Sequence, residues 1–265
     1  MDGLVPISLL PKNVTQQMVQ ALCKPFVTGS SSIMSFRTED DARVNFQMCK
    51  SSDPKDRVQF YDIWAETYEK DSSLMNYKAP HLSVKFLSEN FSGNPEQALV
   101  LDVACGSGWV AKLMHELGFR HFVGVDGSIG MLEQAQKTGL YLDLKPAILG
   151  PEPLPAQPGV FDVVIIVGAL RHGFVPVSII RELHAAAKPG GLICMSRVDP
   201  KCDSGDEYKV NMERELQLME EEDLWSLVAT REMKNYIRDP YRNYSEEEQK
   251  KSYLHGTVYL YKKAM

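Results

Sequence analysis

A short apolar run that ends in a glycine-rich turn constrains the fold of this chain more than any other feature. Residues 98–104 read Ala-Leu-Val-Leu-Asp-Val-Ala, and Cys105-Gly-Ser-Gly108 follows directly. The run has the length and composition of a strand that is buried on both faces of a sheet. The next stretch, Trp109 to Leu117, has a helical pattern and ends at Gly118. A strand, a tight turn and a helix in this order predict the start of a βαβ unit.

The same alternation continues to the end of the chain. Further strands are expected at 121–126, 145–149, 161–167 and 192–198, with helical stretches between them. Two late strands, at 228–237 and 256–261, follow a helix at 206–225 and have no helix between them. We therefore predict an α/β fold, a doubly wound, mostly parallel seven-stranded sheet of the Rossmann-like type with an antiparallel edge. Its ligand is expected at the carboxyl ends of the strands.

An acid at the end of the second strand points to the kind of ligand. Asp126 lies 20 residues after Gly106, where a carboxylate can accept hydrogen bonds from both ribose hydroxyls of a nucleoside. The small residues of the turn let such a ligand pack against the main chain. The spacing predicts a nucleoside-containing ligand. The plainer alternatives are a tight turn without a ligand and a helix-capping role for Asp126.

Two nucleoside cofactors fit this pattern. Gly106-Ser-Gly108-Trp-Val-Ala111 satisfies the dinucleotide fingerprint, so an NAD-dependent dehydrogenase stays open. S-adenosylmethionine is favoured because Asp102, within the first strand, can help to hold the loop and an amino-acid ammonium. Trp109 is also bulky where a pyrophosphate would need close approach. Phe161-Asp-Val-Val paired with Lys188-Pro-Gly-Gly, which marks the fourth and fifth strands, favours it too.

Composition limits the class of protein and its partners. The 29 basic and 35 acidic side chains give a net charge of −6, which disfavours a nucleic-acid binder. The five cysteines form no C-x-x-C pair, and no His/Asp cluster suggests a metal site. No segment approaches the roughly 18 apolar residues of a membrane helix. We expect a monomer in the cytoplasm or nucleus with neither nucleic-acid nor membrane partners.

The first part of the chain reads differently from the rest. Residues 1–50 mix Pro, Ser, Thr and Asn with weak periodicity, which predicts a poorly ordered arm with a short helix near Val14–Leu22. An alternative is that Met34 is the native start. One domain is expected over residues 51–265.

Five motifs in order identify a family. They are Tyr61-Asp-Ile-Trp-Ala-Glu-Thr-Tyr68, LDVACGSG at 101–108, GVDGSIGMLEQAQ at 124–136, FDVVIIVGAL at 161–170 and KPGG at 188–191. Together they resemble the class I S-adenosylmethionine-dependent methyltransferases of the ubiquinone-biosynthesis-like type. The stretch from the first motif to the fifth spans about half of the chain. The resemblance implies methyl transfer with S-adenosylmethionine as cofactor.

The resemblance also assigns roles to the matching positions. The methionine part of the cofactor is expected at Asp102, Gly106 and Gly108, the ribose at Asp126, and the adenine near Gly127 and Met131. Val167 and Gly168 would line the cleft where methyl donor and acceptor meet. Tyr61, Trp64 and Tyr68 would cover the cofactor, although plain packing is the better interpretation for Trp64.

Two positions depart from the family pattern. Ala104 replaces a glycine of the loop, a small-for-small change that we expect to be harmless. Gly150 stands where many relatives carry an acid that binds the adenine amino group, and Pro151-Glu152 follows it. Either backbone groups take over this contact or adenine recognition is weak.

The chemistry of the acceptor is less constrained. His172, just after the fourth strand, is the candidate general base, with a surface loop histidine as the plainer interpretation. Arg171 beside it is either a solvated arginine or an attractor of an anionic substrate. We favour a small molecule over a protein as acceptor. The alternative functions are a cofactor-binding sensor or partner protein without catalysis and, behind it, the dehydrogenase.

Overall fold

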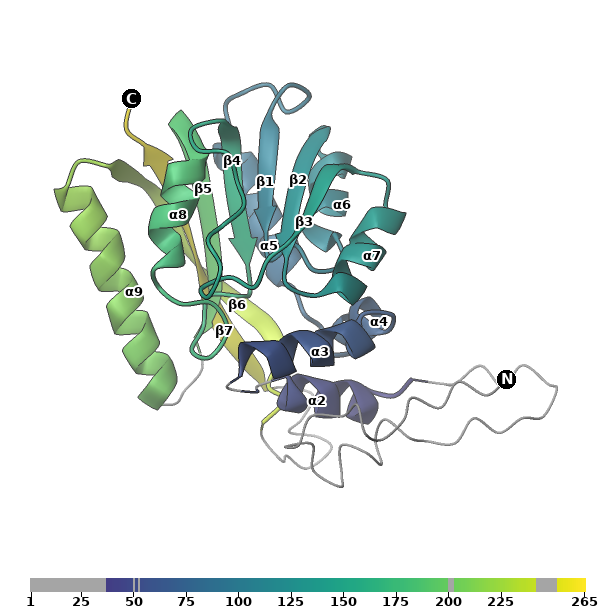
Figure 1. Cartoon of the computed structure of the whole chain (residues 1–265). Coiled ribbons are helices and arrows are strands. Elements are labelled where there is room, and N and C mark those ends of the chain that lie inside the picture. Colours follow the sequence, from purple (N-terminus) through teal and green to yellow (C-terminus); the bar gives the residue numbers. More distant parts are fainter. Residues whose placement is uncertain (1–36, 50, 52, 200–202, 242–251) are drawn as a thin grey trace, which may run out of the picture. The chain divides into compact units, whose positions relative to one another are not determined.

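The computed structural model describes residues 37–49, 51, 53–199, 203–241 and 252–265, without side chains for 203–205. Its centre is a seven-stranded sheet in the order β3-β2-β1-β4-β5-β7-β6 (Figure 1). The strands are β1 (Leu99–Val103), β2 (His121–Asp126), β3 (Tyr141–Pro146), β4 (Phe161–Val167), β5 (Ala187–Asp199), β6 (Trp225–Arg238) and β7 (Tyr253–Lys263). Strands β1 to β5 pair in parallel, and β7 runs antiparallel to both β5 and β6. The predicted fold class is confirmed.

Helices cover both faces of the sheet and also the carboxyl ends of its central strands. They are α2 (Glu39–Met48), α3 (Pro54–Trp64), α4 (Tyr68–Leu74), α5 (Ala79–Asn90), α6 (Trp109–Glu116), α7 (Ile129–Lys137), α8 (Ile179–Ala186) and α9 (Asp203–Glu221). In β4, Val163 and Ile165 pack with α5 and α6, whereas Val164 and Ile166 pack with α8 and α9. The apolar run of β4 is therefore buried on both faces, which a parallel central strand requires.

Strand β3 lies earlier than the sequence indicated. It was expected at 145–149 but spans Tyr141–Pro146, with Tyr141 aligned to Phe122 and Pro146 to Asp126. As an edge strand it has exposed positions and no continuous apolar run, so it gives little hydrophobic signal. The ladder tolerates Pro146 because the next residue supplies the donor: the Ala147 amide donates to the Asp126 carbonyl oxygen at 3.0 Å.

The packed part of the chain begins before the boundary predicted after residue 50. Residues 39–48 form α2, which starts with a capping box in which the Asp41 amide donates to Thr38 Oγ1 (3.2 Å) and the Thr38 amide to Asp41 Oδ2 (3.1 Å). Ala42 and Phe46 of this helix are buried in the core. The predicted helix at 14–22 and the alternative start at Met34 lie outside the described residues.

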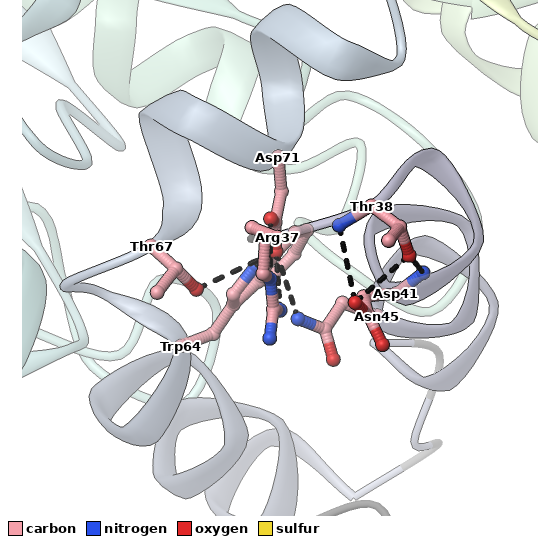
Figure 2. A network of polar contacts seen from close by, with 7 residues as sticks. All are labelled: Arg37, Thr38, Asp41, Asn45, Trp64, Thr67 and Asp71. Atoms are coloured by element: carbon pink, nitrogen blue, oxygen red, sulfur yellow. Dashed lines mark hydrogen bonds and ion pairs between the residues drawn. The ribbon is translucent and has the colours of Figure 1, made fainter. Parts of the chain in front are cut away.

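A buried carboxylate ties together the helices at the N-terminal side of the domain (Figure 2). Asp71 accepts hydrogen bonds from Arg37 Nε (2.7 Å) and Nη2 (2.6 Å), Asn45 Nδ2 (2.9 Å) and Trp64 Nε1 (2.7 Å). These donors come from the second residue before α2, from α2 and from α3, while Asp71 belongs to α4. Figure 1 shows α3 and α4 lying across the carboxyl ends of the central strands. This network holds the helices that cover the ligand edge of the sheet.

Helix α9 packs beside α8. Leu216 and Met219 of α9 are buried in the core, and Arg181 of α8 pairs with Glu215 and Glu222 at 2.6 and 2.8 Å. Across the described ranges no helix combines the length and apolar character needed to cross a membrane.

Candidate functional site

A cleft opens at the carboxyl ends of β1, β2 and β4, beneath α3 and α4. It holds about 790 Å³ of free space, with open solvent at its mouth included. Nine predicted site residues line it: Tyr61, Tyr68, Ala104, Gly106, Asp126, Gly127, Met131, Val167 and Gly168. The lining also includes residues that were not predicted: Arg57, Val58, Tyr77, Ser128, Ala147, Ile148, Leu149, Ala169, Phe174 and Val175. No described residue of α9 lines this cleft.

The turn after β1 bares its main chain to the cleft. Ala104, Gly106 and Gly108 all have positive φ, at 54°, 53° and 83°. A Cβ atom added to Gly106 would meet nothing within 4 Å, so a ligand can lie directly on the backbone there. Gly108 has a different role, because a Cβ atom would lie 3.1 Å from the Tyr141 ring and 3.3 Å from Ala135 Cα. It lets the turn pack closely and does not line the cleft.

Asp126 is positioned by two backbone amides. Gly106 N donates to its Oδ2 at 2.8 Å and Ser128 N to its Oδ1 at 2.9 Å. A carboxylate has about four acceptor positions, so two remain for a ligand. Burial raises the pKa of Asp126, and the two amide hydrogen bonds oppose that rise. The unused oxygen lone pairs on a cleft wall match the two hydroxyls of a ribose.

The N-terminus of α6 is covered by an acid. Glu69 Oε1 of α4 accepts hydrogen bonds from Ser107 Oγ and from Lys112 Nζ, each at 2.6 Å. A dinucleotide would place its pyrophosphate at this helix end, where the dipole favours an anion. Because Glu69 already supplies a negative charge at this end, the arrangement disfavours NAD.

Asp102 lies under the loop and does not line the cleft. Its side chain is 2% exposed and accepts a hydrogen bond from Tyr141 Oη at 2.7 Å. Burial raises the pKa of Asp102 to about 7, and the neighbouring charge of Asp126 adds to the rise. Any effect of Asp102 on a ligand therefore acts across the loop.

Three further predicted residues do not reach the cleft. Trp64 is buried and donates to Asp71, so it packs among the covering helices. Gly150 has a φ of 107°, and a Cβ atom there would lie 2.8 Å from Pro176. The exposed His172 and Gly150 border a neighbouring hollow, which shares Arg57, Leu149, Phe174 and Val175 with the cleft. The turn after β4 directs Phe174 rather than His172 into the cleft, and this separates the candidate base from the site.

Helix α3 is fastened to α7 beside the cleft. Asp62 Oδ1 accepts hydrogen bonds from Ser128 Oγ (2.6 Å) and from Gly130 N (2.9 Å). A Cβ atom on Gly130 would lie 2.6 Å from the Asp62 carbonyl oxygen, so the two helices meet at a glycine contact. Both residues are in the motifs quoted above, but their spacing in the sequence carried no signal that they touch.

Tyr77, an unpredicted residue of the cleft lining, packs closely against the backbone of Gly168. A Cβ atom on Gly168 would lie 2.1 Å from Tyr77 Oη, and the Tyr77 ring also packs against that of Tyr236 at 5.6 Å between centroids. Tyr77 comes from the segment between α4 and α5, and Tyr236 comes from β6. The end of β4 therefore lies under a phenol that a distant part of the chain helps to hold.

Across the described part of the chain, no group of three His, Cys, Asp or Glu side chains could hold a metal ion.

Comparisons with known proteins agree with this geometry. A family model described as a methyltransferase domain matches residues 100–191. Human methyltransferase-like protein 27 is 47% identical over 174 residues, which cover 65% of this chain and 70% of that protein. Ubiquinone biosynthesis O-methyltransferase from Pseudomonas aeruginosa UCBPP-PA14 is 32% identical over 104 residues, or 38% of this chain and 44% of that enzyme.

Two further matches bear on ligands and on the fold. The tRNA U34 carboxymethyltransferase of Hahella chejuensis is 37% identical over 136 residues, 50% of this chain and 38% of that enzyme. The structure of geranyl diphosphate C-methyltransferase from Streptomyces coelicolor, solved with S-adenosyl-L-homocysteine, has a TM-score of 0.53 at 13% identity. It matches 75% of this chain and 86% of that chain, and shows the same fold. The chain belongs to the class I S-adenosylmethionine-dependent methyltransferases, in the family of methyltransferase-like protein 27.

Proposed function

We propose that this enzyme binds S-adenosylmethionine in the cleft and transfers its methyl group to a small acceptor molecule. The observation that carries the proposal is the Asp126 carboxylate, which two amides position beside the bare main chain of Gly106. One group can bind a ribose and the other permits close approach of the amino-acid part. The enzyme class is that of its family, and the roles of single residues are inferred from their positions.

The remaining cleft residues suit the rest of the cofactor. Gly127, Met131, Ile148 and Leu149 form an apolar pocket next to Asp126, which matches an adenine ring. The position predicted for an adenine-binding acid is Gly150, and it lies outside this pocket. Because the Ile148 amide and carbonyl are both hydrogen-bonded to Glu152, we infer that the main chain of Leu149 takes over recognition of the adenine edge.

The protein contributes to the chemistry by positioning the acceptor, shielding the reacting atoms from water and stabilising the sulfonium cation. When bound, the cofactor supplies an electrophilic methyl group on a sulfonium cation. Tyr61, Tyr68 and Tyr77 line the cleft, and burial raises the pKa of each phenol well above its ordinary value. They therefore present neutral aromatic rings, whose faces stabilise a desolvated cation by about 1–2 kcal/mol. Rate acceleration follows from holding the acceptor atom about 3–3.5 Å from the methyl carbon.

The alternatives are weighed by two observations. Glu69 of α4 disfavours the dehydrogenase, because its carboxylate contacts the start of α6, where a pyrophosphate would bind. A binding protein without catalysis has one point in its favour, since no His, Lys or Cys is among the described residues that line the cleft. Methyl transfer to a lone pair that is already available needs no such base. We place the enzyme in the cytoplasm or nucleus, where the buried thiols of Cys49, Cys105 and Cys194 stay reduced.

Titration calorimetry with S-adenosylmethionine, S-adenosylhomocysteine and NAD tests the cofactor. We expect micromolar binding of the first two and none of NAD. Asp126→Ala should weaken binding at least about 100-fold, because two hydrogen bonds to a charged group are lost. The matched control is Asp143→Ala on β3, where the acid is exposed and pairs only with Lys145 at 3.6 Å. Binding of NAD alone, or full affinity in Asp126→Ala, would contradict the proposal.

A further inference from the structure

Two arginines meet at the end of the cleft that follows β4. The guanidinium carbon of Arg171 lies 3.6 Å from the centroid of the Phe174 ring, and that of Arg57 lies 4.9 Å from it. Arg57 is 8% exposed, and the Nε atom of Arg171 has no contact with solvent. Two positive charges are therefore held close together and largely away from water.

Neither guanidinium has an acid as its partner within the described residues. Arg57 donates to the carbonyl oxygens of Ser51 (2.9 Å) and Phe174 (3.0 Å), and Asp53 acts on it only from a distance. Arg171 Nη2 donates to Cys49 Sγ at 3.5 Å, and phenols face the same side chain. Arg171 Nε has no hydrogen-bond partner.

Arg231 provides a contrast within the same molecule. It also stacks on a phenylalanine, with its guanidinium carbon 4.7 Å from the Phe86 centroid, but it pairs with Glu89 at 2.7 Å. Stacking on an aromatic ring is thus compatible with a carboxylate partner, and the missing partner is particular to the Arg57–Arg171 pair. Burial lowers the pKa of Arg57, and the neighbouring charge of Arg171 lowers it further.

Arg57 borders the place where the acceptor must lie, and Arg171 lies directly behind it, against the Phe174 ring. Arg57 and Phe174 line the cleft together with Val167 and Gly168, which end β4. Burial raises the pKa of the Tyr61 and Tyr77 phenols, and the Arg171 charge opposes that rise, so its field reaches the aromatic wall. Asp126, beside the glycine turn, is the acid among the described residues that line the cleft, and Arg57 is the cation among them.

We propose that Arg57 at the cleft wall and Arg171 behind it together hold a carboxylate of the methyl acceptor, whose apolar body lies against Phe174 and the tyrosine rings. A planar carboxylate matches the edge of a guanidinium, and a buried charge pair of this kind discriminates strongly against uncharged analogues. Two donors of Arg57 are already engaged by carbonyl groups, which leaves fewer for the several oxygens of a phosphate and favours a monoanion. This inference rests on the proposed function, since it places an acceptor beside a bound cofactor.

The test uses protein loaded with S-adenosylhomocysteine, whose binding first establishes the cofactor site independently. Benzoate and its uncharged analogue benzamide are then titrated by calorimetry. We expect benzoate to bind at least about tenfold more tightly than benzamide. Arg171→Gln should abolish this preference, Arg171→Lys should keep part of it, and the control Arg231→Gln should keep all of it. The affinity of Arg171→Gln for S-adenosylhomocysteine should stay within about twofold of wild type, and this value also reports that the variant folds.

The outcomes separate this inference from the proposed function. Equal affinity for benzoate and benzamide, or no benzoate binding to the loaded wild type, overturns the carboxylate site and leaves the cofactor site standing. Loss of S-adenosylhomocysteine binding in Arg171→Gln and Arg171→Lys together, with both variants folded by circular dichroism, would assign Arg171 to the cofactor's own carboxylate and overturn the inference. Tenfold tighter binding of phenyl phosphate than of benzoate would overturn the choice of a carboxylate.

Discussion

Asp102 is a carboxylic acid that the fold keeps near its titration point. It is buried beneath the glycine turn, and burial raises its pKa to about 7, whereas the same group in an unfolded chain ionises near pH 4. The folded protein thus binds a proton more tightly than the unfolded chain between those two values. The free energy of unfolding attributable to Asp102 therefore falls as the pH rises from about 4 to about 7.

Cofactor binding should depend on the ionisation of Asp102. A cationic cofactor stabilises the ionised carboxylate, so affinity for S-adenosylmethionine should fall as the pH drops below about 7, by at most about tenfold per pH unit for this group. Calorimetry at pH 6 and 8 measures the change. The Asp102→Asn variant should show a smaller change, with the remainder due to Asp126. A wild-type affinity that is equal at both pH values would contradict this account.

Gly168 illustrates a second constraint on a single residue. Its φ is 77°, and a Cβ atom would lie 2.1 Å from Tyr77 Oη. Gly159 has a φ of 73° and nothing within 4 Å of the corresponding position, so it carries the same backbone demand without the contact.

Alanine substitutions at Gly159 and Gly168 should separate the cost of backbone strain at positive φ from the cost of a steric clash with Tyr77. Gly159→Ala should lower the free energy of unfolding by about 1 kcal/mol, the cost of a left-handed backbone for a side chain. Gly168→Ala should lose about 1–3 kcal/mol more, because Tyr77 must move in a packed site. Chemical denaturation measures both values. Equal losses would show that Tyr77 yields freely and does not define the end of β4.

At the scale of elements, the covering helices α2, α3 and α4 depend on one acid. Asp71 is 0% exposed and accepts hydrogen bonds from Arg37, Asn45 and Trp64 (Figure 2). These helices are short, and short helices are marginal without tertiary contacts. Removing the acceptor leaves the donors unpaired where water cannot replace it.

Asp71→Asn should therefore destabilise the protein and loosen its cover. We expect a loss of about 3 kcal/mol, at the low end for a broken buried pair because Arg37 is a quarter exposed. For a domain of this size the melting temperature should fall by roughly 10 °C. The control, Asp40→Asn, removes an acid that is 87% exposed and should change the stability by less than about 0.5 kcal/mol. A loss no larger than that of the control would show that Asp71 does not hold the cover.

An element of secondary structure was predictable where its own residues carry a clear hydrophobic pattern. Strand β4 was found at its observed bounds because Phe161-Asp-Val-Val-Ile-Ile-Val167 is a continuous apolar run. Strand β3 was misplaced because an exposed edge strand shows no such run. Helix α2 was missed within a polar stretch, since what stabilises it is a capping box and the packing of Phe46 against Trp64, at 4.9 Å between ring centroids.

At the scale of the whole molecule, the cleft is a boundary between two parts of the same domain. Its floor is the carboxyl edge of the sheet, and its cover comes from α3, α4 and the segment that carries Tyr77. Helix α3 is joined to the cofactor side of the cleft by hydrogen bonds from Ser128 and Gly130 to Asp62. We infer that a bound cofactor adds contacts between floor and cover.

Hydrogen exchange with and without S-adenosylhomocysteine tests that coupling. Protection should increase in α3, in α4 and in residues 147–149, because these amides surround the ligand. Strands β6 and β7, which lie at the far edge of the sheet, serve as the internal reference and should not change. A ligand at 100 times its Kd should add about 2.7 kcal/mol of stability. Protection in β6 and β7 without any in α3 would place the ligand elsewhere.

The sequence by itself determined the sheet, the glycine turn and the acid that faces the cleft. These depend on residues close together in the chain: an apolar run forms a strand, Gly106 permits a positive φ, and Asp126 ends the next strand. A parallel neighbour then brings Asp126 to the Gly106 amide because adjacent strands end at the same edge. Local rules suffice wherever the backbone geometry itself creates the site.

Only the tertiary structure decided which side chains complete the cleft. Arg57 and Phe174 are in contact although they lie 117 positions apart in the sequence. Tyr77 reaches Gly168 from the segment between α4 and α5. Trp64, an aromatic of the same motif as Tyr61, turns inward to Asp71, while His172 stays outside. Such placements follow from how helices pack on the sheet, and packing depends on the shapes and polar partners of surfaces that are distant in the chain.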